Sequence, residues 1–160
     1  MLSEDLLRLG RELVPSGPSR PREANLRRAL SCTYYAMFHA AARMCADSMI
    51  GSTSAERTER AWRQVYRSIG HKDVSDRCDK VVKNNMALGF PSGIVTFARQ
   101  FPAAMSDRHR ADYDPSFKPR KGTVLASILA ADQAIAGLMA TDVRHRKAFS
   151  AYLLFKPPRS

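Results

Sequence analysis

Residues 26–45 read LRRALSCTYYAMFHAAARMC, and their apolar side chains recur at steps of three and four residues. This spacing is typical of one face of an α-helix. The face is expected to contain Leu26, Leu30, Tyr34, Met37 or Phe38, Ala41 and Met44. Ser19 offers an N-cap and Pro21 an early-turn residue, so we predict that this long helix runs from Ser19 to about Ser48, before Gly51.

Helical spacing also occurs on both sides of this stretch. The predicted helices cover about residues 2–13, 19–48, 53–69, 73–82, 92–113, 124–139 and 142–149. The pattern Thr53–Glu56 is a capping box for the third helix, Asp73 is the predicted cap of the fourth, and Pro102 is expected to kink the fifth. No segment alternates with period two for long enough to predict a strand. We therefore expect an all-α fold, an up-and-down bundle of four to five core helices with short flanking helices.

The size and composition are those of one soluble domain. The chain has 160 residues and 17.9 kDa, with 44% apolar and 26% charged residues. We expect a single domain over residues 1–160, with its core at about 20–140 and a basic C-terminal tail at 144–160. No apolar run approaches the roughly 18 residues of a membrane span, and residues 1–14 lack a signal-peptide core, so we expect a cytoplasmic protein without membrane contact.

The charge is strongly positive, because 26 basic and 15 acidic residues give +11. The predicted tail contributes Arg144, Arg146, Lys147, Lys156 and Arg159 against no acid. Such an excess attracts polyanions: nucleic acid first, an anionic membrane second and an acidic protein third. The alternative is that an arginine-rich composition reflects only the coding habit of the source genome, and charge alone does not separate the two.

Cysteine and histidine do not form a metal pattern. The three cysteines have no ligand spacing, and His39, His71, His109 and His145 lie 32 or more residues apart. The sequence also has no glycine-rich phosphate loop and no Gly-x-Ser-x-Gly motif. We therefore predict neither a metal site nor a cofactor.

Polar side chains on two predicted helices are the main indication of a site. On the long helix, Arg28, Ser31, Tyr35 and His39 fall at steps of three, four and four. Near the end of the fifth helix stand Arg108, His109, Asp112 and Tyr113. Cations and histidines beside carboxylates and phenols can bind a phosphodiester and move protons on it. The alternative is a buried structural network that locks the two helices together, consisting of Arg28, Ser31, Tyr35 and Asp112 with Arg108.

Two strings in the chain resemble one known family. The segment Arg28–His39, RALSCTYYAMFH, is similar to the second-helix signature of HEPN-domain proteins. The segment Arg108–Pro115, RHRADYDP, resembles the second signature of a bacterial branch in which Arg-x-x-Ala-Asp-Tyr closes a long later helix. The order and spacing of the two strings fit those of the family's two signatures, and the similarity covers roughly residues 20–140.

The resemblance implies a helical bundle that dimerises around a composite site. Many members are metal-independent endoribonucleases, often toxins or antiviral effectors paired with a nucleotidyltransferase or another antitoxin. Each protomer of such enzymes contributes an Arg, an adjacent polar residue and a His further along. Arg108 and His109 match the first two positions, and Tyr113 stands where the family has its His.

Two functions follow as expectations. In the first, the protein is directed to RNA: His109 moves the proton, Arg108 holds the developing charge and Tyr113 bonds a phosphate. The expected substrate contacts are Arg28, Tyr35, Arg67, His71, Lys118, Arg120 and Lys121. In the alternative, the same bundle is a non-catalytic binding module for a protein partner, a nucleotide or nucleic acid.

Overall fold

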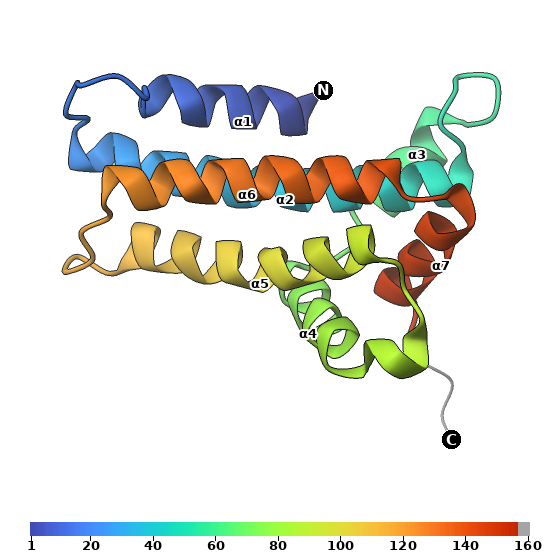
Figure 1. The fold of residues 1–160 in the computed structure, drawn as a ribbon. Helices are drawn as coiled ribbons and strands as arrows, with labels where there is room; N and C mark the ends of the chain where they lie inside the picture. Colours follow the sequence, from blue (N-terminus) through green and yellow to red (C-terminus); the bar gives the residue numbers. More distant parts are fainter. Residues whose placement is uncertain (157–160) are drawn as a thin grey trace.

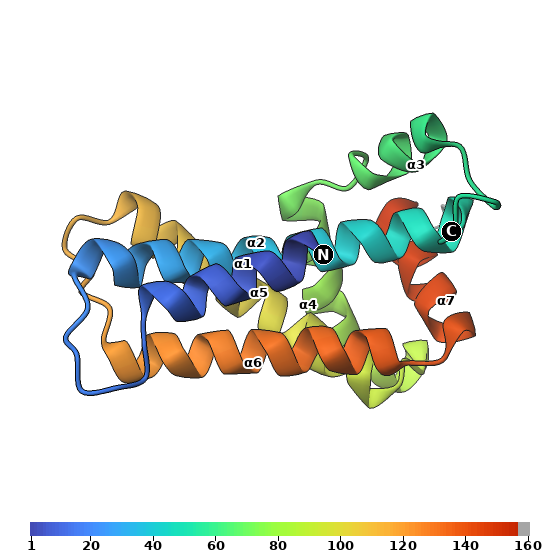
Figure 2. The same cartoon turned by 90° about the horizontal axis from the view of Figure 1, so that it is seen from above.

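Seven helices account for most of residues 1–156, the part of the chain that the computed structural model describes, and this part contains no strand. The helices are α1 (Leu2–Leu13), α2 (Glu23–Ile50), α3 (Glu59–Tyr66), α4 (His71–Leu88), α5 (Ser92–Tyr113), α6 (Lys121–Ala140) and α7 (Val143–Leu154). The predicted all-α bundle is thus confirmed. Figures 1 and 2 show that α1, α2, α5 and α6 lie alongside one another and alternate in direction along the chain.

The bundle is organised around α2, which packs against α1, α3, α5, α6 and α7. Sixteen of its 28 residues are buried, many of them alanines that let neighbouring helices approach closely. A helix in this position is apolar nearly all round rather than on one face. The single face expected from the sequence is therefore only part of what α2 buries; Ala29, Thr33, Ala40 and Cys45 are buried as well.

Four predicted helix starts are wrong, including that of α6, which begins at Lys121 and not at about residue 124. The helix α2 begins at Glu23 after the N-cap Arg22, and the expected cap Ser19 lies in the preceding loop. The helix α3 begins at Glu59, because the Thr58 side chain accepts a hydrogen bond from Ala61 N. The helix α4 begins at His71 after Gly70, earlier than the expected cap Asp73, and it runs to Leu88, six residues past the predicted end.

The predicted capping box at Thr53–Glu56 forms a turn instead of a helix start. The Glu56 carboxylate accepts hydrogen bonds from the backbone N–H groups of Ser52 (3.1 Å) and Thr53 (3.2 Å). The glutamate thus reaches back as in a capping box. The chain after it nevertheless stays non-helical until Thr58, which supplies the true cap.

The helices α5 and α6 meet at two glycines. The helix α5 continues through Pro102, and near its start a Cβ on Gly93 would lie 2.4 Å from the Gly137 carbonyl oxygen and 2.6 Å from Thr141 Oγ1. Contacts this short leave no room for a side chain at Gly93. The close approach of the two helices therefore depends on glycine at this position.

The helix α6 differs from the expectation that no apolar segment reaches membrane-span length. Its mean hydropathy over 18 residues is 1.6, and 28% of that window is buried. Its single acid, Asp132, pairs with Arg11 of α1 at 2.6 Å. Length and composition alone do not place α6 in a membrane, because a core helix of a soluble protein can have both.

Most of the predicted basic tail is the helix α7. Its N-cap Asp142 accepts a hydrogen bond from Arg144 N at 2.8 Å, and Phe149, Ser150 and Leu153 are buried. Residues 144–154 therefore belong to the packed structure. The last part of the predicted tail, residues 157–160, lies outside the described residues.

The glycine contact gives a stability prediction. Gly93→Ala should destabilise the protein by about 1–3 kcal/mol, because overpacking forces α5 away from α6. Gly10→Ala is the matched control, since a Cβ there meets Ile128 at an ordinary 3.6 Å and a helix-interior alanine stabilises by about 0.5–1 kcal/mol relative to glycine. Urea unfolding of both variants measures the difference. An equal effect of the two changes would contradict the close approach.

Candidate functional site

The C-terminal half of α5 is joined to α2 by Arg108 and Asp112. The Asp112 carboxylate accepts a hydrogen bond from Ser31 Oγ at 2.6 Å, and its other oxygen lies 2.8 Å from Arg108 Nε. That Nε is buried and has no aligned hydrogen-bond acceptor, so the contact with Asp112 is an ion pair. Arg108 also donates a hydrogen bond to the Tyr35 hydroxyl at 3.0 Å.

Three tyrosine rings surround the Arg108 guanidinium. Its central carbon lies 5.8 Å from the ring centroid of Tyr34, 5.4 Å from that of Tyr35 and 5.6 Å from that of Tyr113. A guanidinium at this distance from an aromatic ring is held by cation–π attraction. We call Ser31, Tyr34, Tyr35, His71, Arg108, Asp112 and Tyr113 the Arg108 cluster.

His71 joins the cluster from the first residue of α4. Its Nδ1 lies 2.5 Å from the buried Tyr34 hydroxyl, and its ring stacks on Phe38 with centroids 3.8 Å apart. Burial lowers the pKa of His71 below its usual 6.5, and the nearby Arg108 charge lowers it further. Burial also raises the pKa of Tyr34 to about 12, partly offset by Arg108. Both effects on His71 favour its neutral imidazole over the imidazolium.

A second imidazole, His39, stands one turn beyond Tyr35 on α2. Its Nδ1 lies 2.6 Å from the Tyr66 hydroxyl of α3, and its ring is 6.3 Å from that of Tyr35. Burial lowers the pKa of His39, with a further contribution from His71. Because both histidines bind protons more weakly in the folded state, folding stability falls as pH drops below 6.5.

The three predicted catalytic residues contact one another in the order Arg108, Tyr113, His109. Arg108 is beside the Tyr113 ring, and that ring is 4.9 Å from the ring of His109. Tyr113 is 64% exposed and His109 is exposed, so this side of the cluster is open to solvent. On the other side, Tyr35 connects Arg108 to His71, with ring centroids 6.1 Å apart.

Arg28 does not belong to the predicted network. Ser31, Tyr35 and Asp112 contact one another or Arg108, whereas Arg28 is exposed and makes no hydrogen bond or ion pair within residues 1–156. The side chain of Arg67, exposed at the end of α3, likewise has no such contact in the described part of the chain.

Lys118, Arg120 and Lys121 are not among the residues that contact Arg108; they lie in the α5–α6 loop and at the start of α6. There they line a hollow together with residues 16–21 of the α1–α2 loop. The structure thus divides the predicted substrate contacts, leaving Tyr35 and His71 in the Arg108 cluster and these three cations at the loops.

Arg27, the neighbour of Arg28, is a site residue that was not predicted from the sequence. Its guanidinium donates hydrogen bonds to the carbonyl oxygens of Ala111 and Asp114, both at 2.9 Å, and of Phe117. These carbonyls are at the end of α5 and in the loop that follows, where backbone acceptors lack helical partners. Arg27 thereby fixes the end of α5 that carries Arg108. Arg27 lies one helical turn before Ser31, so it is on the same face of α2; this spacing was the signal in the sequence that could have identified it.

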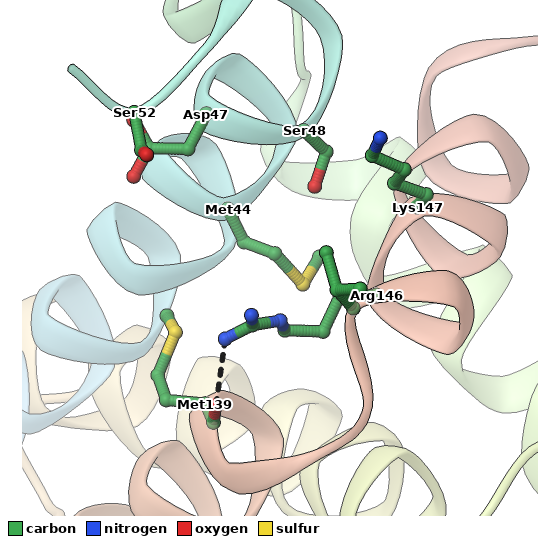
Figure 3. A pocket seen from close by; sticks show the side chains of 8 residues that line it. Met44, Asp47, Ser48, Ser52, Met139, Arg146 and Lys147 are labelled. Carbon is green, nitrogen blue, oxygen red and sulfur yellow. Dashed lines mark hydrogen bonds between the residues drawn. The ribbon is translucent and has the colours of Figure 1, made fainter.

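A further basic residue is used to cap a helix. Figure 3 shows Arg146 of α7 in a pocket of about 190 Å³, where its guanidinium donates a hydrogen bond to the Met139 carbonyl at 2.6 Å. This carbonyl is in the last turn of α6, a position that favours a cation. The charge of Arg146 therefore stabilises the α6–α7 corner.

Within residues 1–156, no group of three or more His, Cys, Asp or Glu side chains is placed to hold a metal ion. No family model matches the sequence, and no curated protein or solved structure matches it either. The chemistry of the Arg108 cluster consequently rests on its own geometry: a held guanidinium, flanking imidazoles and phenols, and an open face.

The geometry of the Arg108 cluster predicts that the pKa of His71 depends on the charge of Arg108. Arg108→Gln should raise the pKa of His71, because removing the nearby positive charge favours the imidazolium. NMR titration of the imidazole protons measures this value. Arg110→Gln on the same helix is the control, since Arg110 lies over the Phe117 ring and should leave His71 unchanged. An unchanged His71 pKa in the Arg108 variant would contradict the arrangement.

Proposed function

We propose that the protein is a HEPN-like, RNA-directed endoribonuclease that acts without a metal ion, and that the Arg108 cluster binds the scissile phosphodiester. The observation that carries the proposal is that one guanidinium is connected to imidazoles on two sides, to His71 through Tyr35 and to His109 through Tyr113. A cation with a proton acceptor and a proton donor beside it is what RNA transesterification requires.

The proposed reaction is attack of the ribose 2′-hydroxyl on its own phosphodiester. His71 accepts the 2′-hydroxyl proton; when its Nδ1–H is donated to Tyr34, its Nε2 carries the lone pair. The P–O5′ bond breaks, and the leaving 5′-oxygen takes a proton from His109. Arg108 stabilises the negative charge on the phosphoryl oxygens. The products are a 2′,3′-cyclic phosphate and a 5′-hydroxyl.

The second candidate is a non-catalytic binding module with the same bundle. Its supporting observation is that Arg108 is held by Asp112, Tyr35 and three rings, as a structural lock would be. In this function the cluster fastens α5 to α2, and binding of a protein partner, a nucleotide or nucleic acid occurs elsewhere on the molecule.

The proposed biological setting is a cytoplasmic toxin–antitoxin or antiviral defence system. The net charge of +11 supports a polyanionic partner such as RNA. In this setting the RNA-directed activity is restrained by an antitoxin, for which a nucleotidyltransferase is the proposed class. This part of the proposal rests on the two sequence strings that resemble the family.

We also propose a homodimer formed through α6. Residues 122–140 contain one charged residue, Asp132, and Leu129 is 55% exposed. Two copies of a chain with charge +11 repel each other least where the surface is uncharged. In Figure 2, α6 lies on the side of the bundle opposite α3. The residues of the Arg108 cluster belong to α2, α4 and α5, so a dimer formed through α6 has one complete cluster in each protomer. This differs from the composite site that the family resemblance implies.

Cleavage of labelled RNA in EDTA tests the enzymatic proposal. The wild-type protein should produce fragments ending in cyclic phosphate, and His71→Gln should lower the rate by about 10²–10⁴-fold, the usual loss for a general base. His109→Gln and Arg108→Gln should also lower it. His145→Gln is the control, because His145 lies on α7 beside Asp142, outside the cluster.

Thermal melting of each variant separates lost chemistry from lost folding. Intact RNA with folded wild-type protein would reject the enzyme and favour the binding module. A His71→Gln variant that is folded and fully active would remove His71 from the reaction.

Light scattering tests the dimer. The wild-type protein at micromolar concentration should have twice the 17.9 kDa chain mass. Leu129→Arg should shift it to the monomer, because the change places a charge in the apolar contact. Met86→Arg adds the same charge at a fully exposed residue of α4 and should leave the dimer intact. A wild-type mass near 17.9 kDa would contradict the proposal.

A further inference from the structure

A large hollow lies at the end of the bundle where two loops run side by side. The α1–α2 loop and the α5–α6 loop meet there, at the starts of α2 and α6 (Figures 1 and 2). The hollow has a volume of about 910 Å³ and is lined by residues from 16–26 and 118–125. We call it the loop-end pocket. Its volume is within the usual range for small-molecule sites.

The rim of the loop-end pocket carries cations that no group within residues 1–156 neutralises. Arg20, Lys118 and Arg120 line it, and their side chains make no hydrogen bond or ion pair within residues 1–156. The acid in the lining is Glu23, which is already paired with Arg27 at 2.9 Å. Like charges around one concavity repel, and an anion bound between them relieves that repulsion.

A fourth cation holds the pocket in shape. Lys121 Nζ donates hydrogen bonds to the carbonyl oxygens of Gly17 and, at 2.7 Å, of Ser19. These bonds fasten the α1–α2 loop to the start of α6. Neither N-cap at this end, Arg22 or Arg120, provides a side-chain cap, so the first-turn N–H groups of both helices add positive potential.

The pocket also has an apolar part. Pro21, Leu26, Pro119 and Leu125 line it alongside the cations. Leu26 is 7% exposed and belongs to the core, so the apolar surface is continuous with the interior of the bundle. A bare phosphate uses only the cations. A ligand that carries both an anionic group and a flat, weakly polar ring matches the whole lining.

We propose that the loop-end pocket binds a nucleoside phosphate, with the phosphate held by Arg20 and Arg120 and the base lying on the apolar residues. The same chemistry occurs in a free nucleotide and at the 5′-phosphorylated end of an RNA chain. The site is independent of the proposed RNA cleavage, because it shares no residue with the Arg108 cluster.

Calorimetric titration with adenosine 5′-monophosphate, adenosine and inorganic phosphate tests the ligand class. The monophosphate should bind more tightly than either of the other two. Arg20→Gln combined with Arg120→Gln should weaken its binding at least tenfold. Arg60→Gln with Arg99→Gln is the matched control, since it removes two exposed arginines outside the pocket and should change binding less than twofold.

The source of the ligand is identified with a ten-nucleotide RNA that carries either a 5′-phosphate or a 5′-hydroxyl, tested in the His71→Gln variant to prevent cleavage. Tighter binding of the phosphorylated RNA, lost in the Arg20/Arg120 variant, assigns the pocket to RNA ends. Equal binding of the two RNAs, with the monophosphate still bound, assigns it to a free nucleotide.

Three results would overturn the inference. The first is that neither the monophosphate nor the phosphorylated RNA end binds. The second is that adenosine binds as tightly as its monophosphate. The third is that the pocket variant and the control variant lose binding affinity equally. His71→Gln changes the Arg108 cluster, and Arg20→Gln/Arg120→Gln changes the loop-end pocket. Ligand binding tests the pocket and RNA cleavage tests the cluster, so a failure of one proposal is distinguished from a failure of the other.

Discussion

The contact of Arg108 with Asp112 and Tyr35 determines how the end of α5 lies on α2. Its 2.8 Å ion pair and 3.0 Å hydrogen bond place a guanidinium among three tyrosine rings, and the Ser31 hydroxyl holds the carboxylate from the other helix. Because the Arg108 side chain is 23% exposed, the charge is largely removed from water but still reachable from one side. Such a charge is fixed in position before any substrate arrives, which is the condition for electrostatic stabilisation of a transition state.

The positive charge of the chain is divided among different tasks. Arg27 and Arg146 are used internally, at the ends of α5 and α6, where they satisfy backbone carbonyls. Arg20 and Arg120 are left without partners in the described residues and surround a hollow. Part of the arginine-rich composition therefore serves folding, and the polyanion site that we propose draws on the remainder, so the net charge of +11 overstates the charge that is free to bind a ligand.

The all-α fold could be predicted from the leucine and aromatic spacing, but the helix starts and the complete cluster could not. Ser19 and Thr53 have the chemistry of N-caps, yet Arg22 and Thr58 occupy those positions because tertiary contacts and competing turns decide among nearby candidates. Ser31, Tyr35 and Asp112 were predicted to lie together from their helical phase. Arg27 and Arg28 are adjacent and chemically identical, so only the rotation of α2 shows which of them reaches α5. The contact of His71 with Tyr34 joins residues 37 positions apart, and no local spacing indicates it.

The pKa of His71 in free and RNA-bound protein tests the central claim most directly. Burial and the Arg108 charge lower this pKa in the free protein. A phosphate bound at Arg108 would offset that positive charge, so saturation of Arg20→Gln/Arg120→Gln protein with a non-cleavable 2′-deoxy-substituted RNA should raise the His71 pKa. The same complex formed with the Arg108→Gln variant should show a smaller rise. An identical His71 titration with and without bound RNA would contradict the assignment of the Arg108 cluster as the phosphodiester site.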